Sequence, residues 1–133
     1  MKATAFQEQV APLVAELYAS ANTHDTDRHL ALYARDPDLI FIINGEVIRG
    51  WDAYRERQRE WWEDGKAVGA YEAVGQPIYE AVGEDSGLTT LFIAGRRQLP
   101  DGQTRDLQVA FTALWRKLPE GWRITYAHES SIR

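Results

Sequence analysis

The best candidate for acid–base chemistry in this sequence is a histidine close to its C-terminal end, His128. A neutral imidazole with an ordinary pKa of about 6.5 could take a proton from a bound substrate near neutral pH. Tyr126 and Ser130 lie two residues to either side, so on a strand the three side chains would share one wall. No carboxylate stands two residues from His128 to orient its ring. A structural histidine or a plain ligand contact therefore stays open beside the catalytic base.

A second group of polar residues forms the segment HDTDRH at 24–29. His24 and His29 flank an expected helix start, and their spacing is poor for side chains that must converge on one metal ion. Asp25 has a sufficient role as a helix cap. The sequence also lacks a Gly-rich phosphate loop, a Gly-x-Ser-x-Gly elbow and any cysteine nucleophile. We therefore expect neither a metal nor a cofactor.

The first half of the chain predicts helices and one hairpin. Apolar residues at helical spacing predict a helix over 4–22, and a short second helix follows it. The β-branched and aromatic run at 39–43 reads as a strand, and Asn44-Gly45 after it is a strong hairpin signal. A third helix is expected over 51–64.

The second half predicts an antiparallel meander, because short turn clusters separate its strand-like runs. These runs cover residues 68–82, 88–99, 104–117 and 122–131. Gly75 and Pro77 interrupt the first run and would let the sheet curl. One face of the last strand is expected to carry Trp122, Ile124, Tyr126, His128 and Ser130. The expected fold is a single α+β domain over 1–133, a cone-shaped curved antiparallel sheet covered by N-terminal helices.

Aromatic side chains could line a pocket for a flat hydrophobic ligand inside this cone, or could fill the cone as core. Besides Tyr126 and Ser130, the predicted ligand-binding residues are Tyr33, Phe41, Trp62, Phe92, Phe111 and Trp115. The outer sheet face is expected to carry Leu91, Ile93, Ala110 and Leu114. A second copy of the chain, or the chain's own loops, could cover that face.

The order of elements resembles the nuclear transport factor 2-like superfamily over nearly all of 5–131. The segments that carry the resemblance are LALYARDPDLIFI, GEVIRGWDAYRE and FTALWRKLPEGWRITYAHESS. The chain looks most like the SnoaL-like branch and the association domain of calcium/calmodulin-dependent kinase. Its most specific part is the frame of Trp115 and Trp122 leading to His128 and Ser130, with Tyr126 where relatives often have a second histidine. The resemblance implies a cone-shaped α+β barrel, a ligand pocket inside it and dimerisation through the convex sheet face.

The resemblance does not fix an activity, because this fold hosts isomerases, hydrolases, cyclases and assembly modules. Steroid isomerases of the superfamily place a carboxylate base on the strand that corresponds to 39–43, where this sequence has no acid. Epoxide hydrolase-like members need an Asp-Arg-Asp arrangement around a water. Arg105 and Asp106 are neighbours on an expected strand, so they should point to opposite faces.

Composition limits the classes of partner. The net charge of −5 disfavours nucleic acids, which need a basic face. No apolar run is long enough for a signal peptide or a membrane span, so we expect no membrane partner. The absence of cysteine fits a reducing cytoplasm, which is the expected location.

Three functions remain as hypotheses. The first is a small-molecule-binding domain with an apolar pocket in each protomer of a homodimer. The second is a cofactor-free isomerase, cyclase or hydrolase of a small hydrophobic substrate with His128 as its base. The third is an oligomerisation module whose cone is filled. A vacant cavity of a few hundred cubic ångströms would favour the first two.

Overall fold

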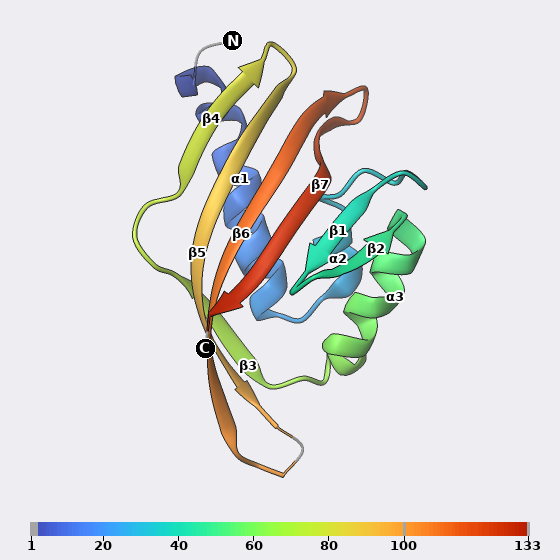
Figure 1. Cartoon of the computed structure of the whole chain (residues 1–133), viewed down its shortest axis with the longest axis vertical. Coiled ribbons are helices and arrows are strands. Elements are labelled where there is room, and N and C mark those ends of the chain that lie inside the picture. The colour runs from blue at the N-terminus through green and yellow to red at the C-terminus, as the bar shows by residue number, and fades with distance from the viewer. Residues whose placement is uncertain (1–2, 100, 133) are drawn as a thin grey trace.

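The computed structural model describes residues 3–99 and 101–132 and shows helices packed against a curved, unclosed sheet (Figure 1). The helices are α1 (Ala3–Asn22), α2 (Thr26–Leu30), α3 (Trp51–Trp61) and the 3-10 helix η1 (Glu63–Gly65). The strands are β1 (Ile40–Ile43), β2 (Glu46–Arg49), β3 (Gly69–Ala73), β4 (Ile78–Gly83), β5 (Ser86–Gln98), β6 (Thr104–Leu118) and β7 (Gly121–Ile132). The α+β class is the predicted one.

The sheet has the strand order β2-β1-β7-β6-β5-β3, and β4 also pairs with β5. The expected strand over 68–82 is two strands, β3 and β4, which pair with opposite halves of β5. Gly75, with its left-handed φ of 70°, lies in the break between them. The sheet is mixed and not fully antiparallel, because β1 runs parallel to β7. Turn signals predict pairs between consecutive strands, and this pair joins strands far apart in the sequence.

Helix α1 covers the inner face of the sheet with its apolar stripe. Phe6 and Val10 are fully buried, and the Phe6 ring packs edge-on against Trp122 at 5.4 Å between ring centroids. Gly87 of β5 leaves room for this ring, because a Cβ atom there would lie 2.5 Å from it. Within the described residues, no helix combines the length and the apolar character that a membrane crossing requires.

A β-bulge in the β6–β7 hairpin changes which face the last residues occupy. Trp115 pairs with Ile124, whereas the preceding residue, Leu114, pairs with Tyr126. Thr125 is therefore an extra residue on β7, and the in–out alternation shifts by one after it. Beyond the bulge, Ala127 and Glu129 point inward, opposite Ala113 and Phe111 of β6.

The expected alternation of the last strand is therefore wrong after Ile124. Tyr126, His128 and Ser130 lie on the outer face and are exposed. The assignment of Leu91 and Ile93 to the outer face is also wrong, since both line the interior opposite Phe111 and Val109. Ala110 and Leu114 do lie on the outer face, where they pair with Ser130 and Tyr126.

Candidate functional site

A cavity of about 290 Å³ lies between the concave face of the sheet and the helices. Most of its lining side chains are apolar or aromatic. They come mainly from helices α1, α2 and α3 and from strands β1, β3, β5, β6 and β7. Its polar side chains are His29, Asn44, Gln58, Arg97, Arg105, Glu129 and Ser131. Side chains therefore do not fill the cone, and a small molecule has space inside it.

Four of the predicted pocket residues line this cavity, namely Tyr33, Phe41, Trp62 and Phe111. Trp115 does not, because it is fully buried in the core, where its Nε1 donates to Thr89 Oγ1 at 3.0 Å. Phe92 lies on the outer face and is 42% exposed. Tyr126, His128 and Ser130 are also absent from the lining, since the bulge turns them outward. His128 thus has no access to the cavity in this structure.

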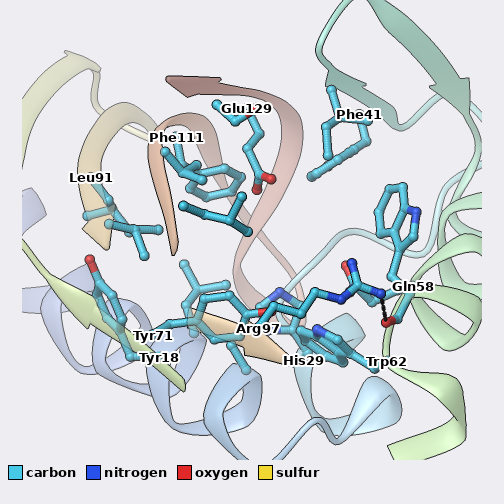
Figure 2. Close-up of a pocket in the computed structure, with 18 of the residues that line it drawn as sticks. Tyr18, His29, Phe41, Gln58, Trp62, Tyr71, Leu91, Arg97, Phe111 and Glu129 are labelled. Atoms are coloured by element: carbon cyan, nitrogen blue, oxygen red, sulfur yellow. Dashed lines mark hydrogen bonds between the residues drawn. The ribbon is translucent and has the colours of Figure 1, made fainter. Parts of the chain in front are cut away.

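Glu129 takes the place expected for His128 and directs its carboxyl group into the cavity, between Phe111 and Phe41 (Figure 2). It is partly exposed, and its open side faces this cavity. Across the described residues, no side chain forms a hydrogen bond or ion pair with this carboxyl group. Burial raises the pKa of Glu129 to about 7. At neutral pH the protonated and the ionised forms of this carboxyl group are therefore both populated.

Two tyrosines provide hydroxyl groups to the same space. Tyr54 is fully buried, and its ring stacks on that of Phe41 with 4.1 Å between ring centroids. Its hydroxyl oxygen lies 3.2 Å from the Tyr33 hydroxyl oxygen and 3.2 Å from Gln58 Oε1. Burial raises the pKa of both tyrosines, and the negative charge of Glu129 raises both further. Both phenols therefore stay protonated. Tyr54 donates its one proton to the Tyr33 hydroxyl or to Gln58 Oε1, so the Tyr33 proton is the one left to donate to a ligand.

The histidines of the segment 24–29 do not converge on one point. The ring of His29 lies inside, with Nδ1 2.8 Å from Ser20 Oγ, and burial lowers its pKa to about 4, so it is neutral. Asp25 caps α2 by accepting from the backbone N–H of Arg28 at 3.1 Å, and Asp27 pairs with Arg55 at 2.9 Å. In the described part of the chain, no three potential metal ligands come together.

The site brings a carboxyl group and one free phenol donor, the Tyr33 hydroxyl, to the wall of an apolar cavity. The resemblance to steroid isomerases implies a carboxylate base within 39–43, and β1 carries no acid. Here the carboxylate comes from the adjacent strand, since Ile43 pairs with Glu129. The sequence prediction that this strand has no acid is confirmed, and the carboxyl group in the cavity belongs to a residue of β7.

The family follows from comparison with known proteins. Residues 10–133 match the family model of the SnoaL-like domain. The chain belongs to the SnoaL-like domain family. No curated protein sequence matches this SnoaL-like domain significantly. The match to the family model confirms the predicted resemblance to the SnoaL-like branch.

Solved structures agree with this membership. The SnoaL-like domain superposes on a nuclear transport factor 2-like superfamily protein from Salmonella enterica with a TM-score of 0.84 at 20% identity, covering 98% of this chain and 93% of that one. A ketosteroid isomerase-like protein from Erwinia carotovora gives a TM-score of 0.77 at 17% identity, with 95% of each chain covered. A Xanthomonas campestris protein, provisionally assigned as a calcium/calmodulin dependent protein kinase II association domain, gives 0.75 at 18%, covering 92% and 85%. At these identities the similarity establishes the fold.

Sequence reasoning missed Glu129, and the cause is the register of the last hairpin. The two-residue turn between Leu118 and Gly121 sets a register that, continued without interruption, would place His128 opposite Phe111. The bulge at Thr125 places Glu129 there instead. A glutamate between two polar residues near the end of a strand gives no signal of burial. A bulge would have indicated the change of face, but no residue type in this segment is a sequence signal for a bulge.

Proposed function

We propose that this SnoaL-like domain binds a small, mainly apolar molecule in the cavity on the concave side of its sheet. The observation that carries the proposal is the 290 Å³ cavity, with an apolar and aromatic wall and a few polar groups directed into it. That combination is typical of small-molecule sites, in which apolar surface supplies affinity and isolated polar groups orient the ligand. The third hypothesis, an assembly module with a filled cone, loses its premise.

A fluorescence titration with the neutral aromatic probe N-phenyl-1-naphthylamine tests this binding. Val109 lies on the cavity wall, so Val109→Trp should fill part of the space and weaken probe binding at least tenfold. Gln108→Trp is the matched control, because Gln108 is exposed on the opposite face of the same strand. Equal probe affinity in the two variants, or no binding to the unaltered protein, would contradict the proposal.

The second candidate is a cofactor-free enzyme in which Glu129 replaces His128 as the base. The observation that favours it is a carboxyl group with a pKa of about 7 beside two protonated phenols. Glu129 would take a proton from a carbon next to a carbonyl group, and the electron pair would move onto the carbonyl oxygen. The Tyr33 hydroxyl would donate a hydrogen bond to that oxygen. In a β,γ-unsaturated ketone the electron pair would then move back from the oxygen through the shifted double bond, and the protonated Glu129 would return its proton to the far carbon of the original double bond. An isomerisation of this kind needs no cofactor.

Turnover of a panel of enolisable ketones would test this candidate. Glu129→Gln should lower kcat/KM at least a hundredfold, and His128→Ala should leave it within about twofold. Because the base must be ionised, kcat/KM should rise as the pH increases through about 7 and then level off. The enzyme reading fails if the unaltered protein and Glu129→Gln turn over the panel equally.

We also propose that two copies of the chain pair through the convex sheet face. Phe92 and Tyr126 are 42% and 44% exposed there, beside the partly buried Ala110 and Leu114. These residues are neighbours across β5, β6 and β7, since Phe92 pairs with Ala110 and Leu114 pairs with Tyr126. The polar row of Thr90, Thr112 and His128 lies between these two apolar groups. Exposed apolar side chains on one sheet face favour a self-complementary interface.

A further inference from the structure

Two arginines stand directly opposite each other on the inner face of the β5–β6 hairpin, at one end of the cavity. Arg97 of β5 pairs with Arg105 of β6, and both line the cavity. Within the part of the chain that the structure describes, neither side chain forms an ion pair with a carboxylate. Like charges directly opposite on neighbouring strands are destabilising. The hairpin therefore keeps an unfavourable pair of charges beside the candidate site.

The adjacent pair on the same two strands has the opposite pattern. Arg96 faces Asp106 across the ladder on the outer side, and the two form an ion pair at 2.9 Å. One step along the hairpin, the inner side places arginine opposite arginine. The outer pair neutralises itself, and the inner pair leaves two positive charges without a partner. An unneutralised pair next to a cavity is suited to an anion that comes from outside the chain.

The surrounding groups hold one of these arginines in position without neutralising it. Arg97 Nη2 donates to the backbone carbonyl of Trp61 at 3.1 Å, which ties the guanidinium to the end of α3. Burial lowers the pKa of His24, and the positive charge of Arg97 lowers it further. Glu129 does not serve as the counter-charge, because burial alone accounts for its raised pKa.

We propose that the ligand of the cavity is an organic anion, with an apolar or aromatic body inside and an oxyanion group bound between Arg97 and Arg105. This inference rests on the proposed binding function and specifies its ligand class. Guanidinium groups bind carboxylate or sulfonate oxygens through paired, charge-assisted hydrogen bonds. The body of the ligand would then reach from this end of the cavity toward Phe111 and Glu129.

Two fluorescent probes with the same ring framework test the charge requirement. They are 8-anilino-1-naphthalenesulfonate, which is anionic, and N-phenyl-1-naphthylamine, which lacks the sulfonate. The unaltered protein should bind the anionic probe more tightly. Arg97→Gln and Arg105→Gln should each lower the affinity for the anionic probe roughly 5- to 30-fold. Each should leave the affinity for the neutral probe within about twofold of the unaltered protein. Arg96→Gln is the matched control, because it removes the same charge from the outer face of the same hairpin, and it should change neither affinity.

The outcomes separate this inference from the proposed function. If the neutral probe binds and Val109→Trp weakens it, while both inner arginine variants leave the sulfonate probe unaffected, the organic-anion inference is overturned and cavity binding stands. If Val109→Trp affects neither probe, or neither probe binds, both proposals fall.

A stability measurement gives a second, independent readout of the inner pair. Arg105→Glu places a carboxylate opposite Arg97, so it should raise the Tm and remove the preference for the sulfonate probe. An unchanged or lowered Tm would show that the two arginines do not repel each other, and would remove the reason to assign them to an external anion.

Discussion

Glu129 is a carboxylic acid in surroundings very unlike water. Its carboxyl group faces a mostly apolar cavity, and burial raises its pKa from 4.5 to about 7. An unpaired ionised group in such a place lowers the free energy of unfolding. A residue that is present despite this destabilisation is a candidate for a functional role. The destabilisation itself can be measured in the absence of any ligand.

Replacing this carboxyl group should stabilise the protein in a pH-dependent way. Below pH 4.5 the glutamate is protonated in both the folded and the unfolded chain, so Glu129→Gln should be nearly neutral. As the pH rises from 4.5 through about 7, the unfolded chain ionises first and the unaltered protein loses stability. At pH 8 the variant should be more stable by on the order of 1–3 kcal/mol.

The other charged groups around the cavity should not obscure this effect. Tyr33 and Tyr54 stay protonated over the range, His29 is neutral above about pH 4, and Arg97 and Arg105 stay charged. Urea unfolding at pH 4.5 and pH 8 measures the difference, with the exposed Glu120→Gln as control. A stability gain of equal size at both pH values would mean that the Glu129 carboxyl is not held in a desolvated site.

Individual elements were largely predictable from the sequence, and their pairing was predictable only in part. The stripe of α1, the Asn44-Gly45 hairpin and the turns around the long strands carry local signals, and the structure has elements at each of these places. The parallel contact of β1 with β7 has no local signal, because it depends on the whole chain having folded. The face of Glu129 was not predictable for a related reason. A single bulged residue, Thr125, exchanges the two faces of β7 beyond it.

The candidate site was therefore half predictable. Residues whose strand continues without interruption, such as Phe41 and Phe111, were placed correctly at the cavity. Residues beyond the bulge were assigned to the wrong face, so the candidate acid–base group in the cavity is Glu129 and not His128. An error in the predicted register of a long two-stranded hairpin leaves the predicted fold correct. It assigns the wrong side chains to the cavity.

At the scale of the whole molecule, the two faces of the sheet have different surroundings. The concave face and the helices enclose the cavity, and the convex face carries exposed apolar residues. In a dimer formed through the convex face, the outward-pointing Tyr126 and His128 would belong to the interface. Their contribution would then be to assembly, and the cavity of each protomer would remain open to ligand.

Sedimentation at micromolar concentration tests this arrangement. The protein should sediment with about twice the 15.2 kDa chain mass, and Tyr126→Arg should shift it to the monomer by placing a charge in the interface. Val47→Arg is the control, because Val47 is 50% exposed on β2, away from the β5–β7 face. A monomeric unaltered protein would contradict the dimer, and dissociation by Val47→Arg as well as Tyr126→Arg would place the interface elsewhere.

The most direct test of the central claim measures how fast single thiols react in a chain that has no cysteine of its own. Glu129→Cys and His128→Cys differ by one position and lie on opposite faces of β7. N-phenyl-1-naphthylamine at saturating concentration should slow the reaction of Glu129→Cys with a thiol reagent at least tenfold and leave the rate of His128→Cys unchanged. Protection of His128→Cys alone, or of neither variant, would contradict a ligand cavity on the concave side of the sheet.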